Sequence, residues 1–186
     1  LLCGATAEVA HYLGLPHWST SGASDAMLED GQAAAEGTIS NLFAGLVASD
    51  LSHNVGFLEA CLTGSLLNLV LMDESIGYVK QVLRGIEVNE DMLSVDLIDR
   101  VGPGGDYAEV ASGARHDGWN LWQPTLLDRQ DRAAWVGAGG KTMRERAREK
   151  LITILDTHEA TPLPAEVQAQ IDEIVEQAEE RLATSA

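Results

Sequence analysis

His53 and Asn54 lie at the end of a strand predicted within residues 51–57, and they are the residues of this chain best placed to do chemistry. Polar side chains at the carboxyl ends of parallel strands project into the mouth of a barrel or the crevice of an open sheet. In a barrel, catalytic side chains project from this position. The alternative is a structural histidine with satisfied hydrogen bonds, and the residue pattern leaves both interpretations open.

A second loop carries Ser21 and Asp25, which follow a short strand predicted over residues 15–20. Trp18 lies within that strand. An aromatic ring beside a carboxylate can bind a quaternary ammonium ion through cation–π attraction. Packing in a core or an interface is the alternative for this ring and for the three other tryptophans. These are Trp119, Trp122 and Trp135.

Cys61 could be a metal ligand or a nucleophile, but no second Cys or His stands at a metal-binding spacing from it. A buried structural thiol is the simpler interpretation. The other cysteine of the chain is Cys3, and two cysteines cannot form a disulfide framework. This usage suits a reducing compartment, so we expect a cytoplasmic protein.

These residues would be positioned by an alternation of helices, strands and small-residue loops. Helices are predicted over residues 6–14, 30–48 and 64–85, and strands over residues 15–20 and 51–57. This order is typical of βα units in a parallel sheet, whose functional loops follow the strands. Asp73 and Glu74 interrupt the last of these helices, either as a functional pair of acids or as a turn that faces solvent.

The chain changes character after Gly85, where helices and an irregular segment replace the alternation. A short helix is predicted over residues 89–101, a break over Gly102–Gly105, a charged helix over 141–158 and an amphipathic helix over 161–182. We therefore divide the chain into residues 1–88, which hold the βα units, and residues 89–186, a helical C-terminal extension.

Charge and composition exclude several classes of function. The chain has 186 residues, with 12 Lys and Arg against 29 Asp and Glu, which gives a net charge of −17. Such a surface repels phosphate backbones, so a nucleic-acid partner is excluded. The apolar stretches fall short of the roughly 18 residues that a membrane span needs. Hydrophobic residues make up 45%, which excludes disorder for most of the chain.

Four stretches of the sequence resemble the C-terminal part of the trimethylamine methyltransferase family. They are Ser21–Ala26 with Asp30–Ala34, Gly56–Glu59, Leu83–Val88 and Val101–Gly105. The match covers nearly all of the chain, and the last two stretches at their observed separation make it specific. Residues 108–120 match poorly and are expected to form a variable covering loop.

The resemblance implies an α/β fold that is the later portion of a (β/α)8 barrel, helix-dominated, with the C-terminal helical extension. It implies an enzyme that moves a methyl group from a methylated quaternary or tertiary amine to a corrinoid, the cobalamin-type cofactor of a separate protein. No cofactor would be bound permanently. Founding members use pyrrolysine, and a larger branch, with members that demethylate glycine betaine, lacks it. The sequence contains no pyrrolysine. If the pyrrolysine position of the family falls within this chain, the resemblance implies the branch that lacks pyrrolysine.

A barrel of this kind needs about 200 to 250 residues, and the chain does not open with Met. We therefore expect it to be a fragment of a larger protein and to be inactive in isolation. Its apolar sheet edge predicts self-association into a homo-oligomer.

The family places a histidine in the strand-end region, so the resemblance supports His53 as a substrate contact. Asn54, Ser21 and Asp25 are the next candidates, followed by Trp18. No catalytic residue and no metal ligand are assigned. Two other functions stay open: a non-catalytic betaine-binding module, and a helical interaction module that docks through its acidic tail.

Overall fold

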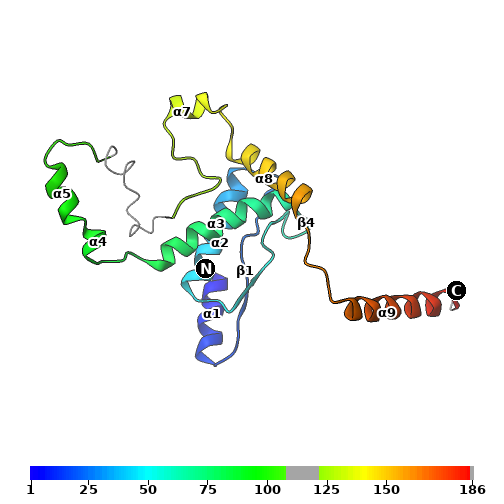
Figure 1. Ribbon diagram of the computed structural model, residues 1–186. Coiled ribbons are helices and arrows are strands. Elements are labelled where there is room, and N and C mark those ends of the chain that lie inside the picture. Colours follow the sequence, from blue (N-terminus) through cyan, green and yellow to red (C-terminus); the bar gives the residue numbers. More distant parts are fainter. Residues whose placement is uncertain (108–121, 185–186) are drawn as a thin grey trace. The chain divides into compact units, whose positions relative to one another are not determined.

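The computed structural model describes residues 1–107 and 122–184 and is built mostly of helices (Figure 1). The helices are α1 (Leu2–Tyr12), α2 (Gly31–Leu46), α3 (Leu66–Arg84), α4 (Glu90–Leu93), α5 (Val95–Val101), α7 (Arg132–Gly137), α8 (Met143–Thr157) and α9 (Ala165–Thr184). The strands are β1 (Trp18–Thr20), β2 (Leu51–His53), β3 (Phe57–Leu58) and β4 (Thr63–Gly64). Trp119 and the loop predicted over residues 108–120 lie outside the described residues.

The strands β1 and β2 pair in parallel, with α2 as the connection between them. Trp18 lies opposite Leu51, and Thr20 lies opposite His53. A parallel pair needs a crossover connection, and a helix is the usual one. The predicted alternation of strands and helices is therefore confirmed as an α/β arrangement.

The predicted strand over residues 51–57 is wrong in its length, because β2 ends at His53. Asn54 and Gly56 have positive φ angles of 65° and 87°, and such left-handed residues cannot continue a strand. The chain then turns into the antiparallel hairpin β3–β4, where the sequence pattern predicts a loop. The helix predicted over 89–101 is likewise divided into α4 and α5 by Ser94, whose φ is 51°.

Polar side chains cap the N-termini of α2 and α3. Asp30 accepts hydrogen bonds from the amides of Gln32 at 2.8 Å and Ala33 at 3.3 Å, as predicted for the start of this helix. Ser65 caps α3 by accepting from the Asn68 amide at 3.1 Å. The two helices cross closely where small residues of α2, such as Gly37, face large side chains of α3, such as Met72.

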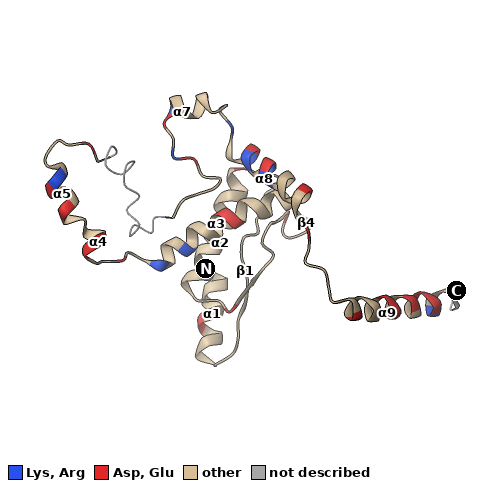
Figure 2. Cartoon of the chain, in the orientation of Figure 1, with Lys and Arg blue, Asp and Glu red and all other residues tan. Residues whose placement is uncertain are grey.

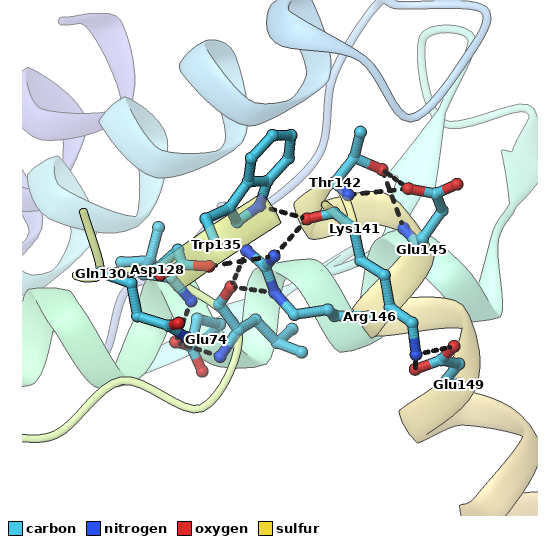
Figure 3. Close-up of polar contacts among 11 residues, drawn as sticks. Glu74, Asp128, Gln130, Trp135, Lys141, Thr142, Glu145, Arg146 and Glu149 are labelled. Atoms are coloured by element: carbon cyan, nitrogen blue, oxygen red, sulfur yellow. Dashed lines mark hydrogen bonds and ion pairs between the residues drawn. The ribbon is translucent and has the colours of Figure 1, made fainter. Parts of the chain in front are cut away.

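Residues 122–150 pack against α3 through a buried carboxylate (Figure 3). Glu74 is 4% exposed and accepts four hydrogen bonds, two from Thr125 and one each from the amides of Leu126 and Leu127, at 2.6 to 3.0 Å. The Arg146 guanidinium donates to the Leu126 carbonyl oxygen at 2.7 and 3.0 Å. Glu74 is therefore a structural clamp, and the interpretation as a turn that faces solvent is wrong for it.

The chain forms two compact units, Leu1–Ile152 and Thr153–Ala186. The first contains the strand pair and an apolar cluster of Val70, Leu71, Met72, Leu126 and Ala147. The second contains α9, whose apolar side chains, including Ile171 and Ile174, are exposed. Acidic residues recur along α9, as the red segments of its ribbon show (Figure 2). None of the described helices has the length and apolar character that crossing a membrane requires.

Candidate functional site

The β1–β2 pair presents one face that carries the Trp18 and His53 side chains. Side chains alternate along a strand, so Trp18 and Thr20 share a face with their partners Leu51 and His53. Ser19 lies on the other face and is 3% exposed, whereas the Trp18 side chain is 65% exposed. The face with Trp18 and His53 is therefore accessible to a ligand.

His53 is held in place by its two neighbours on β1. Its ring centroid lies 4.7 Å from that of Trp18, with the ring planes at 66° in an edge-on contact. Its Nε2 lies 3.3 Å from the Thr20 Oγ1 hydroxyl. Within the described residues, Nδ1 has no hydrogen-bond partner. The half-buried imidazole thus keeps one nitrogen available for a ligand.

Ser21 lies on the opposite face from His53, although it is the next residue after β1. Its side chain is 2% exposed and lines a cavity of about 290 Å3 on the helix side, together with Asn41 and Val55. Its backbone amide donates to the His53 carbonyl oxygen at 3.2 Å. The structure therefore joins Ser21 to His53 through the main chain but does not bring their side chains together.

Asn54 is turned toward the hairpin instead of toward Trp18. Its Nδ2 donates to the Cys61 sulfur at 3.5 Å, and asparagine tolerates the left-handed conformation that it adopts here. This contact ties the end of β2 to the β3–β4 loop. In the described segments, no group of three His, Cys, Asp or Glu side chains is arranged to hold a metal ion.

Asp25 lies in the loop between β1 and α2, and its carboxylate is exposed. Its amide donates to Glu36 Oε2 at 3.0 Å, and the hydroxyl of Ser24 donates to the same oxygen at 2.6 Å. The hydrogen bond from Ser24, followed by those from Asp25 and Gln32, lowers the pKa of the Glu36 carboxyl. Glu36 is thus ionised at neutral pH and anchors the loop from α2.

The loops that follow β1 and β2 run side by side through backbone hydrogen bonds. Gly56 donates its amide to the Gly22 carbonyl, and Ser24 donates to the Phe57 carbonyl, both at 3.0 Å. This ladder brings the Ser21–Asp25 loop against the segment that follows His53. The two loops that follow the strands were expected at one edge of the sheet, and their backbones do lie together there.

Sequence reasoning missed Thr20 and Glu36. The sequence could have indicated Thr20, because it lies two positions after Trp18 on a predicted strand, and side chains two positions apart share a face. Glu36 gave no local signal, since it lies one turn beyond the capped start of α2 and contacts the loop only in the folded chain.

The sequence model of the family described as trimethylamine methyltransferase (MTTB) matches residues 1–183. The trimethylamine methyltransferase MttB of Desulfitobacterium hafniense (strain DSM 10664 / DCB-2) is 31% identical over 180 residues, which is 97% of this chain. That of Methanosarcina thermophila is 32% identical over 167 residues, or 90% of this chain. The glycine betaine methyltransferase of D. hafniense (strain Y51) is 26% identical over 178 residues, or 95% of this chain.

The aligned region is a minor part of these relatives. It covers 36% of the first, 34% of the second and 37% of the third. The chain therefore spans little more than a third of the length of the curated relatives that it matches.

Proposed function

Because the chain belongs to the trimethylamine methyltransferase family, we propose that it contributes the amine-binding edge of an enzyme that demethylates a methylated quaternary or tertiary amine. The methyl group would pass to a corrinoid carried by a separate protein. In this proposal β1, β2 and their helices are the later part of a (β/α)8 barrel. The relatives are named as methyltransferases, which does not favour the alternatives of a betaine-binding or helical interaction module.

The observation that carries the proposal is the accessible pair of Trp18 and His53 on one face of the strands. A tryptophan face attracts a quaternary ammonium by cation–π interaction, and the attraction grows as water is excluded. The imidazole beside it could hold the carboxylate of a betaine through a charge-assisted hydrogen bond. The exposed carboxylate of Asp25 would add a counter-charge for the cation.

The corrinoid would act as a co-substrate, since it would arrive on a partner protein. In its reduced form its cobalt supplies a strong nucleophile for the methyl carbon. A quaternary ammonium is already an activated leaving group and needs no proton donor. This chain would orient the N-methyl group and exclude water, so its contribution would be positioning and desolvation.

The complete polypeptide, as its gene encodes it, is the protein in which this function is tested. The purified protein is mixed with free cob(I)alamin and either trimethylamine or glycine betaine, and methylcobalamin formation is followed by absorbance. We expect turnover with one of these amines, and none from residues 1–186 alone, because a barrel core closes only with all its strands. If the complete protein methylates cob(I)alamin with neither amine, the proposed function is wrong.

Substitutions test the site within this function. His53→Ala should reduce kcat/KM for the amine at least several-fold, and Trp18→Ala should act mainly through a higher KM, since cation–π binding is lost. His158→Ala is the matched control, because this histidine is exposed in the linker after α8. Unchanged turnover in the His53 variant would remove that residue from the site.

A further inference from the structure

The loop between β1 and α2 is held by two side chains of α2 that lie one turn apart. Glu36 accepts from the Asp25 amide at 3.0 Å, and the Ser40 hydroxyl accepts from the Gly22 amide at 3.0 Å. Residues four apart share one face of a helix, so both side chains point toward the loop. The first half of the loop is therefore fixed to α2 at Gly22 and at Asp25.

Glu36 makes the stronger of these attachments. Its Oε2 receives both the Ser24 hydroxyl, at 2.6 Å, and the Asp25 amide, and its Oε1 receives Gln32 Nε2 at 3.0 Å. Hydrogen bonds to an ionised acceptor are about twice as strong as neutral ones. Ser24 is 5% exposed, and its oxygen in turn accepts from the Ala26 amide at 2.9 Å.

The same loop leaves the carboxylate of Asp25 exposed at the strand-end edge. Within the described residues this carboxylate has no hydrogen-bond or ion-pair partner, whereas its backbone amide is bound to Glu36. A residue whose backbone is held in place and whose carboxylate is unpaired is suited to bind a cation. The main chain that carries this charge is held by Glu36.

We infer that Glu36 is a positioning residue, which sets the place of the Asp25 carboxylate at the amine-binding edge by holding Ser24 and Asp25. The inference rests on the proposed function for the identity of the cation. The ordering of the loop by Glu36 does not depend on that function, so the two parts are tested separately.

The first measurement is amide hydrogen exchange of residues 22–26 in the complete polypeptide without substrate. Glu36→Ala should raise the exchange of this segment about tenfold or more, because a charge-assisted acceptor is lost. Glu36→Gln retains one carbonyl oxygen and should restore most of the protection. Gln32→Ala, which removes the other partner of Glu36, is the control and should leave the exchange unchanged.

The second measurement is amine kinetics on the same variants. Glu36→Ala should raise KM for the amine several-fold with a smaller change in kcat, Glu36→Gln should recover most of the loss, and Gln32→Ala should resemble the wild type. Should Glu36→Ala fail to fold, Ser24→Ala removes one of the two loop bonds and gives the same readouts.

The outcomes separate the two proposals. Unchanged exchange at residues 22–26 in Glu36→Ala overturns the positioning role, whatever the substrate is. Raised exchange with an unchanged KM overturns the link between loop position and amine binding. A wild-type protein that turns over no methylated amine contradicts the proposed function, while the exchange measurement still decides the role of Glu36.

Discussion

Glu74 carries a buried negative charge that is balanced by hydrogen-bond donors. No Lys or Arg in the described part of the chain lies within ion-pair distance of it, and its four donors come from Thr125, Leu126 and Leu127. Burial raises the pKa of this carboxyl, but the bonds from Thr125, Leu126 and Leu127 outweigh that effect, and the pKa lies below its ordinary value. The segment after residue 122 is thereby fixed to α3 by an ionised side chain.

Glu74→Gln should lower the free energy of unfolding by about 2 to 3 kcal/mol at neutral pH, because the amide cannot accept all four bonds and its NH2 group opposes backbone donors. Urea denaturation followed by tryptophan fluorescence measures this. Asp73→Asn, at the neighbouring position, is the matched control. The Asp73 side chain is 73% exposed and pairs with Lys150 at 3.5 Å, so its substitution should lower the free energy of unfolding by less than about 1 kcal/mol.

The stabilities of the wild type and of Glu74→Gln should depend differently on pH. Since the folded pKa of Glu74 is lowered, its contribution is complete above the ordinary pKa of a glutamate and is lost as the pH falls through the lowered value. The stability difference between wild type and Glu74→Gln should therefore shrink in acid. A difference that stays constant down to acid pH would contradict the clamp.

At the scale of elements, the first turn of α3 packs directly on the turn that follows β2. A Cβ on Gly56 would lie 2.9 Å from the Leu69 Cα, and the φ of Gly56 is +87°. The amide of Ser65, which caps α3, donates to the Gly56 carbonyl at 3.1 Å. Glycine is required here both for the left-handed backbone and for the close approach of the helix.

Gly56→Ala should lower the free energy of unfolding by about 2 kcal/mol or more, since conformational strain adds to a clash with backbone atoms that cannot rotate away. Gly14→Ala separates the two effects, because Gly14 has a similar φ of +66° with nothing within 4 Å of an added Cβ. It should cost about 1 kcal/mol. Thermal denaturation of both variants, followed by circular dichroism, gives the comparison, and equal costs would show that the helix contact adds nothing.

At the scale of the whole molecule, a seven-residue segment, His158–Pro164, separates α8 from α9 and is exposed throughout. It contains two prolines and has no regular secondary structure. Exposed segments of this kind are preferred sites of proteolysis, whereas bonds within packed helices are protected. The exposed segment before α9 should therefore be an early cleavage site.

Limited digestion with a glutamate-specific protease should cut after Glu159 before it cuts after Glu36 or Glu74, which are in helices and hydrogen-bonded. Mass spectrometry of a time course identifies the fragments. Cleavage after Glu74 as early as after Glu159 would mean that the clamp on α3 opens as readily as the linker.

Three helices and two strands of the first 88 residues followed in outline from the sequence, because caps, apolar periodicity and turn residues act over a few positions, whereas the β3–β4 hairpin did not. Asp30 as the cap of α2 and the strand around Trp18 are examples. The family also followed from the sequence, since its motifs are short and local, and the match over residues 1–183 confirms it. The five candidate site residues stay predictions, although their places in the fold are now known.

Tertiary structure decided which of these residues meet. Register and strand alternation put Trp18 beside His53 and turned Ser21 to the opposite face. Glu36 binds Asp25, which lies 11 positions away in the sequence, and Glu74 binds Leu127, which lies 53 positions away. No local pattern encodes such pairings, because they arise from the packing of whole helices against strands and loops, and that packing is settled only when the chain has folded.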